Sequence, residues 1–343
     1  MLVATLYFLF QSFHPQHSLA ATTANSLQKV GVPVPSRWTH AEPPRITKVT
    51  SNLNRNELFE SAFATHEAQN ELHGYDLRVL RDRTSDGWKN QAAFLLSIVM
   101  NELEKPVEQR TGWLLWFQPD VIVLNPQIPL EIFLPPEPEF SEVHFLATHD
   151  NTGDLDSGVF FLRVHDWSAR LLLEVLSTPT DAPEMQFARR KDRIALSTAL
   201  KSASFRDSVV YQPRRWYNAY AMSANASEYQ HGDVQLHFHG IGGDKWSGLA
   251  RTLDLLSSTP GDFSVPLGQT TYPAETDAYW HRIATARRAL QKAEEHMNED
   301  DIDAKVNRLS YALNYEADKQ KVMQEAIDGL RDAMGVSNGE HAI

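Results

Sequence analysis

The feature that most constrains the fold of this chain is the apolar run from Trp113 to Leu124. Gln118 and Asp120 are its only polar residues. A strand with one solvated face alternates apolar and polar residues, whereas a continuous apolar run is typical of a central strand covered on both faces. The run therefore predicts a sheet buried between two layers of helices.

Strand-like and helix-like segments alternate from Arg45 to about Leu253, which favours an α/β domain with a mostly parallel sheet. Strands are expected at 46–49, 75–80, 113–124, 143–148 and 159–164, and helices at 56–73, 89–104 and 167–176. We expect this domain to span residues 45–260.

A different pattern follows Pro273, where apolar residues recur three and four positions apart. We expect helices at 283–297 and 306–334, separated by the acidic segment 298–303. Residues 275–343 are therefore predicted to form a C-terminal helical arm, a hairpin or coiled coil that packs against the domain or a partner helix.

The N-terminus is apolar, and no charged residue precedes Lys29. The segment 1–21 is open to three interpretations: a signal-anchor, a cleaved signal, or a buried N-terminal segment. Residues 22–44 are rich in Pro and Thr and are expected to form an extended stem.

Charge and cysteine content exclude several classes of protein. Thirty-two basic against 44 acidic side chains give a net charge of −12, so nucleic-acid binding driven by electrostatics is not expected. The chain has no cysteine, which excludes thiol nucleophiles, disulfides and cysteine-ligated metals. An anionic substrate would need a metal ion or a local basic cluster.

Asp120 comes shortly after the apolar residues 113–117. A strand that ends there places the Asp120 carboxylate at the carboxyl edge of the sheet, where α/β proteins form ligand sites. The spacing alone leaves two interpretations open, a ligand site or a solvated turn with Asp120 as its cap. Further stretches of the sequence, taken together, bear on the choice between a ligand site and a solvated turn. They are His73-Gly74-Tyr75, 129–135, Asp156-Ser157-Gly158 leading to Trp167-Ser168, 211–220, and 234–240.

With the segment 113–126, these stretches resemble, in the same order, the fungal and plant galactosyl/mannosyl/xylosyltransferase family. The resemblance covers about residues 45–253 and implies a GT-A type fold. It also implies a retaining transfer of a sugar from a UDP or GDP donor to a glycan hydroxyl, assisted by Mn²⁺. A hard divalent ion suits this chemistry because it neutralises the departing diphosphate.

The same resemblance implies a single-pass type II Golgi membrane protein with a lumenal catalytic domain. Its implied partners are the nucleotide-sugar donor, the glycan acceptor, and further copies of itself or other glycosyltransferases as an oligomer.

Site residues follow from the resemblance one by one. Asp120, the second acid of the family's DxD, and His237, at its H-F position, are the implied metal ligands. Asp156 and Asp192 are the implied catalytic residues. Donor or acceptor binding is implied for Gln118, Asp156, Gly158 and Arg193. Lys245, beside a Gly-rich loop, and Trp216, in an aromatic and basic segment, are candidate substrate-binding residues on their own chemistry.

Three positions depart from the family pattern. Gln118 replaces the first acid of DxD, Asp156 replaces the Asn of L-N-x-G, and Arg193 replaces the Gln of D-Q-S-A. These changes favour an alternative function, a non-catalytic relative that binds a nucleotide sugar or partners an active transferase.

Three polar or basic segments have structural alternatives. His239 is expected to serve as a partner for backbone or carboxylate, and the Gly-rich loop 240–243 before Lys245 is suited to wrap a diphosphate. The segment 214–217 is either an aromatic edge for an acceptor sugar or a structural strand end.

Overall fold

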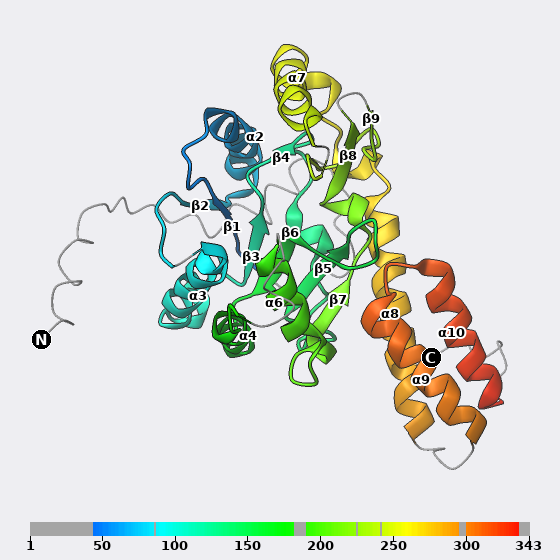
Figure 1. Cartoon of the computed structure of the whole chain (residues 1–343). Helices are drawn as coiled ribbons and strands as arrows, with labels where there is room; N and C mark the ends of the chain where they lie inside the picture. Colours follow the sequence, from blue (N-terminus) through cyan, green and yellow to red (C-terminus); the bar gives the residue numbers. More distant parts are fainter. Residues whose placement is uncertain are drawn as a thin grey trace, which may run out of the picture.

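The computed structural model describes residues 44–85, 87–181, 190–223, 226–240, 242–294 and 300–335. Its larger sheet has six strands in the order β2-β1-β3-β6-β5-β7 (Figure 1). Five strands run in one direction, and β6 runs antiparallel to its neighbours β3 and β5. The predicted α/β class with a mostly parallel sheet is confirmed. The strands are β1 (Ile46–Ser51), β2 (Asp76–Leu80), β3 (Trp113–Phe117), β5 (Phe145–His149), β6 (Leu155–Arg163) and β7 (Val209–Tyr211).

The central strand β3 is buried on both faces, as its apolar run predicts. Leu114 and Trp116 pack in one hydrophobic cluster, while Leu115 and Phe117 pack in another on the opposite face. Alternate side chains of a strand point to opposite faces, so a strand between two layers must be apolar throughout. The first face is covered by α3 (Asn90–Leu103), α4 (Asp166–Ser177) and α6 (Lys191–Lys201).

The predicted strand 113–124 is two strands in different sheets. It breaks after Phe117, and β4 (Val121–Val123) joins a smaller sheet of order β4-β10-β8-β9. Pro119 has no N–H to donate to a sheet ladder, so the break falls where Pro119 would interrupt one. The other strands are β8 (Ala219–Ser223), β9 (Ala226–Ser227) and β10 (Gln235–His237).

Helix α2 (Glu57–His73) fixes β4 in place. The Thr65 hydroxyl accepts a hydrogen bond from the Val123 N–H at 2.9 Å, and His66 Nε2 lies 3.1 Å from the Val121 carbonyl. Burial holds the pKa of His66 well below its usual value, so the ring is neutral and its Nε2–H donates to that carbonyl. The strand that follows Asp120 is thus tied to a helix by two side chains.

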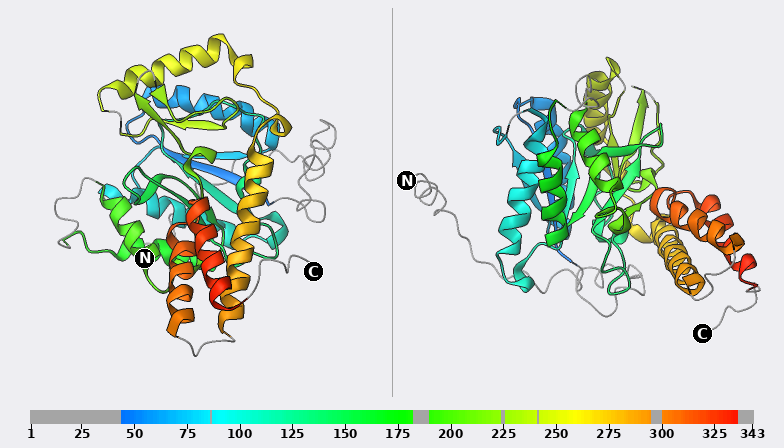
Figure 2. Two further views of the ribbon diagram at one scale, coloured as in Figure 1. Left: turned by 90° about the vertical axis from the view of Figure 1, so that its right-hand side faces the viewer. Right: turned by 60° about the horizontal axis from the view of Figure 1, so that its bottom comes forward.

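The arm has three helices rather than the predicted two, and Figure 2 shows them at one side of the sheet. Its first helix is part of the main core, since Tyr272, Tyr279 and Trp280 cluster with residues of β1 and β3. Trp280 packs on Phe140 with ring centroids 4.9 Å apart. The helices are α8 (Tyr272–Glu294), α9 (Asp300–Tyr315) and α10 (Gln320–Ala333).

The prediction of a single-pass type II membrane protein is contradicted. None of the helices among the described residues combines the length and the apolar character needed to cross a bilayer. The segment 1–21, predicted as an anchor, and the stem up to residue 43 lie outside the described residues.

We expect Trp280→Ala to lower the free energy of unfolding by about 3–5 kcal/mol, because it removes a large buried ring from the shared core. Trp246→Ala is the matched control. Trp246 is 44% exposed against 2% for Trp280, so we expect a loss of no more than about 0.5–1 kcal/mol. Urea denaturation followed by circular dichroism measures both, and equal losses would show that the arm is not part of the core.

Candidate active site

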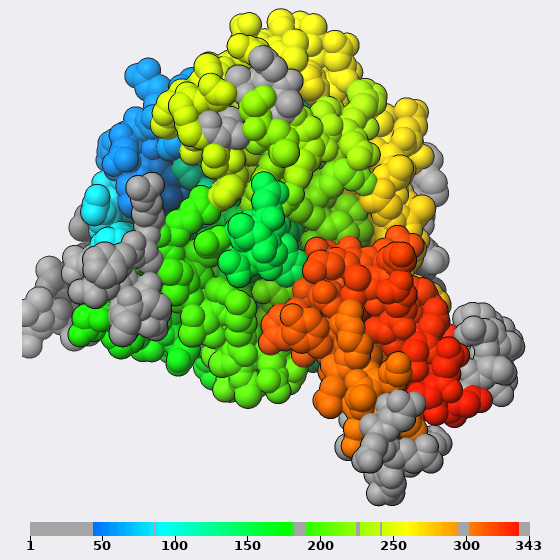
Figure 3. All heavy atoms as spheres, turned by 45° about the vertical axis from the view of Figure 1, so that its right-hand side comes forward, coloured from blue at the N-terminus to red at the C-terminus, as the bar shows by residue number. Residues whose placement is uncertain are grey.

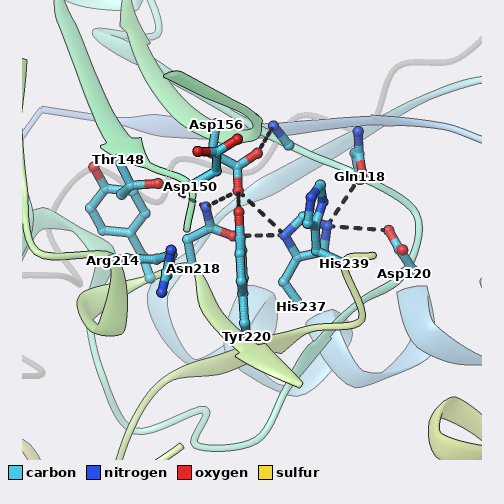
Figure 4. A network of polar contacts seen from close by, with 12 residues as sticks. Gln118, Asp120, Thr148, Asp150, Asp156, Arg214, Asn218, Tyr220, His237 and His239 are labelled. Carbon is cyan, nitrogen blue, oxygen red and sulfur yellow. Dashed lines mark hydrogen bonds and ion pairs between the residues drawn. The ribbon is translucent and has the colours of Figure 1, made fainter. Parts of the chain in front are cut away.

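The site forms where the ends of the strands β3, β6 and β10 meet. The Gln118 N–H after β3 donates to the Gly158 carbonyl of β6 at 2.8 Å, because the two strands are antiparallel neighbours. Strand β10 pairs with β4 and places His237 opposite Val121. The Phe238 N–H donates to the Asp120 carbonyl at 3.1 Å. Segments far apart in sequence thus meet at one edge, as Figure 4 shows.

His237 is the centre of this cluster and is fully buried. Its Nδ1 lies 2.7 Å from Asn218 Oδ1. The Asn218 amide nitrogen donates to Thr148 Oγ1 and to Asp156 Oδ2, both at 2.8 Å, so Oδ1 is the atom left to accept. His237 therefore carries a proton on Nδ1, and in the neutral ring Nε2 presents a lone pair.

Two oxygen atoms face that lone pair. His237 Nε2 lies 3.2 Å from Gln118 Oε1 and 3.6 Å from Asp120 Oδ1. Acceptor atoms so close together in a buried site repel one another unless positive charge lies between them. A hydrogen-bond donor or a positive charge is needed at this point: a proton on Nε2, a Gln118 amide turned to present its NH2 group, or a metal cation.

Asp120 is 2% exposed, so the interpretation of a solvated turn cap is wrong. Lys245, at the start of α7 (Asp244–Ser258), places Nζ 2.5 Å from Asp120 Oδ2. Burial alone would raise the pKa of Asp120, but His237 and Lys245 hold it well below its usual value. Asp120 is ionised, with Oδ1 directed toward His237.

Asp156 is ionised as well, and hydrogen-bond donors surround it. It accepts from the Gly158 N–H at 2.7 Å, from the Asn218 amide and from the Tyr220 hydroxyl. Burial acts to raise the pKa of Asp156, but the neighbouring His237 ring and these donors lower it overall. Three donors occupy most of the acceptor capacity of one carboxylate.

A second set of potential metal ligands is Asp156, His237 and His239, whose ligand atoms lie within 4.8 Å of one another. This set is less suited to a cation. Asp156 already accepts three hydrogen bonds, and both ring nitrogens of His239 face the Arg190 guanidinium, at 3.1 and 3.3 Å. The group formed by Gln118, Asp120 and His237 is the better cation site.

Gly158 is required by the packing of His237. A Cβ built on Gly158 would lie 2.5 Å from His237 Cε1, far inside van der Waals contact. The strand β6 can pass beside the imidazole only because this residue has no side chain.

The structure brings six of the predicted residues into this cluster: Gln118, Asp120, Asp156, Gly158, His237 and Lys245. Arg193 lies beside it, with Nη1 2.5 Å from Asp150 Oδ2. Asp192 lines a small pocket with apolar neighbours such as Leu95 and Phe160, where burial raises the pKa of its carboxyl.

Trp216 lies elsewhere. It is 1% exposed, stacks on Phe133 with centroids 5.8 Å apart, and donates its indole N–H to Glu275 of α8 at 2.8 Å. A ring in this position is part of the core, which favours the structural interpretation of the segment 214–217 over an acceptor edge.

Asn218 and Tyr220 are members of the site that the sequence did not single out. Asn218 directly precedes β8 and Tyr220 lies in it, and Tyr220 pairs with His237 across the parallel β8–β10 ladder. Residues two apart on a strand share a face, so this spacing was a usable signal. This spacing alone did not indicate a functional site, because Asn and Tyr side chains also occur often in protein cores.

Residues 134–243 match the model of the galactosyl transferase GMA12/MNN10 family. This match supports a glycosyltransferase family for the chain. The matched region contains Asp156, Gly158, Asn218 and His237, and it begins after Asp120. The predicted resemblance to galactosyl- and mannosyltransferases of this type is thereby confirmed at the level of a glycosyltransferase family.

Solved structures with a similar chain path are also glycosyltransferases. One is described as a glycosyltransferase involved in the glycosylation of the major capsid of PBCV-1. It is 15% identical in sequence, and the superposition has a TM-score of 0.47. The aligned region covers 62% of this chain and 100% of that structure. Another is the galactosyltransferase LgtC in complex with donor and acceptor sugar analogs, 13% identical with a TM-score of 0.40, covering 63% of this chain and 99% of its own. No curated protein sequence matches significantly.

We expect Gly158→Ala to destabilise the fold by about 1–3 kcal/mol, because its methyl group must displace the buried His237 ring. Gly261→Ala is the control, since a Cβ there meets no atom within 4 Å. Thermal denaturation measures the stability, and the histidine NMR resonances report the position of the ring. If His237 keeps its resonances in Gly158→Ala, the close contact is not the reason for glycine here.

Proposed function

We propose that this chain is a retaining glycosyltransferase that moves a hexose or pentose from a UDP or GDP sugar to a glycan hydroxyl with the help of a divalent cation. The observation that carries the proposal is the convergence of Gln118 Oε1 and Asp120 Oδ1 on His237 Nε2. The family match over residues 134–243 supports the transferase chemistry.

The residues at this point fit Mn²⁺. One carboxylate oxygen, one amide carbonyl oxygen and one imidazole nitrogen form a mixed donor set of the kind this ion accepts. The bound ion supplies positive charge to the diphosphate as the glycosidic bond breaks. Asn218 keeps the proton of His237 on Nδ1, which leaves Nε2 available as a ligand.

The remaining residues have distinct roles in this proposal. Lys245 holds Asp120 by an ion pair and is placed to bind a phosphate oxygen of the donor. Asp156 orients Asn218 and Tyr220, and acts on the donor sugar through them. Asp192 lies on the wall of the neighbouring pocket with Trp88 and Gln91, and we assign it to a hydroxyl group of the donor sugar.

A second candidate function is a non-catalytic transferase-like protein. The specific observation in its favour is the Lys245–Asp120 ion pair, since an ammonium group neutralises this carboxylate without a metal. The two candidates differ in turnover. Release of free UDP or GDP from a panel of nucleotide sugars, with Mn²⁺ and with a chelator, supports catalysis if it depends on the metal. Binding of a nucleotide sugar without any release supports the second candidate.

For the metal site, we expect Asp120→Asn to abolish the Mn²⁺-dependent part of nucleotide binding, because it removes the only carboxylate directed at His237 Nε2. Gln118→Asp should strengthen Mn²⁺ binding about tenfold or more, since it restores an anionic ligand. Calorimetric titration of UDP and GDP, with and without Mn²⁺, measures both changes.

Asp76→Asn is the matched control, because Asp76 is an exposed carboxylate on the edge strand β2. It should bind nucleotide and metal as the unaltered chain does. Metal-dependent binding that survives in Asp120→Asn would rule out the site formed by Gln118, Asp120 and His237.

A further inference from the structure

A cavity between two helices of the arm lies apart from the cluster around His237. It has a volume of about 470 Å³ and is enclosed by α8 on one side and α10 on the other. This volume falls within the range of sites for small molecules. Figure 3 shows the arm, in orange to red, standing out from the body of the molecule.

The lining of this cavity is mixed polar and apolar, and its charged side chains carry an excess of positive charge. Arg282 and His281 come from α8, and Arg331 comes from α10. Asp328 is the one carboxylate among the lining residues, and it already accepts a hydrogen bond from Gln324 at 2.9 Å. The lining thus holds two arginines and one carboxylate that is already hydrogen-bonded, in a chain whose net charge is −12.

The two arginines lack ion-pair partners among the described residues. Arg282 Nε is buried with no hydrogen-bond partner there, and its Nη1 reaches only the Ala278 carbonyl, at 3.5 Å. Burial lowers the pKa of Arg282, which is the expected effect of taking a guanidinium out of water. A guanidinium group that is partly removed from water and has no anionic partner gains free energy when acceptor oxygens reach its terminal nitrogen atoms.

We infer that the cavity between α8 and α10 is a binding site for a small oxyanion ligand, a phosphate or carboxylate compound, held by Arg282 and Arg331. Guanidinium groups bind the oxygens of phosphate and carboxylate in a bidentate fork, so both arginines are suited to one anionic group. The volume leaves room for the organic part of such a ligand. This inference is independent of the proposed transferase activity.

The test uses the full chain and inorganic phosphate, with sodium acetate as the carboxylate arm and sodium chloride at equal ionic strength as the reference. We expect phosphate to raise the thermal midpoint. Loss of one charge-assisted contact in Arg331→Gln should raise the dissociation constant for phosphate about tenfold. Arg288→Gln, an exposed arginine on the same helix α8 that does not line the cavity, is the control and should bind as the unaltered chain does.

Asp328→Asn should lower the dissociation constant for phosphate, whereas Arg331→Gln should raise it. It keeps a hydrogen-bond acceptor for Gln324 and removes the competing negative charge, so phosphate binding should become tighter. A preference for phosphate over acetate, or the reverse, identifies the anionic group of the ligand. The inference is overturned if neither anion binds better than chloride, if Arg331→Gln and Arg288→Gln behave alike, or if Asp328→Asn weakens binding.

Discussion

The antiparallel insertion of β6 into an otherwise parallel sheet is the constraint on which the site depends. The end of β3 lies beside the start of β6 only because the two strands run in opposite directions, which joins Gln118 to Gly158. The smaller sheet then adds His237 from β10, and its β8 neighbour adds Asn218 and Tyr220. Neither sheet alone contains a complete set of ligands, so the site exists where the two sheets meet.

Where the two sheets meet, local ion pairs and hydrogen bonds determine the electrostatics, rather than the net charge of the chain. Two ionised carboxylates, Asp120 and Asp156, are buried within reach of one imidazole. Buried charges are tolerated only when they are paired and hydrogen-bonded, and here Lys245, Asn218 and Tyr220 provide that compensation. Two carboxylates against one ammonium group leave the cluster with an excess of negative charge, which suits a cation at this point.

Much of this arrangement could be predicted from the sequence, because burial and motif spacing are local properties. The apolar run predicts the central strand, the family resemblance assigns Asp120 and His237 to one site, and the Gly-rich loop beside His237 adds Lys245. Other features depend on contacts between distant segments. The arm bends between α9 and α10 without a Gly or Pro signal, where Asp318 Oδ2 meets His149 Nδ1 at 3.2 Å. Trp216 looks like a surface aromatic beside two arginines, and only the position of α8 shows that it is buried.

The shared core of the domain and the arm has a consequence for how the chain folds during synthesis. Strand β1 and helix α8 belong to one hydrophobic cluster although more than half of the chain separates them. Loops of that length must close before such contacts form, which slows folding and prolongs the exposure of apolar surface. While the ribosome is still making the last helices, Phe133 and Trp216 remain without their covering layer. The apolar residues that α8 covers therefore stay exposed until this helix has been made, although the residues of the cluster around His237 have by then all been made.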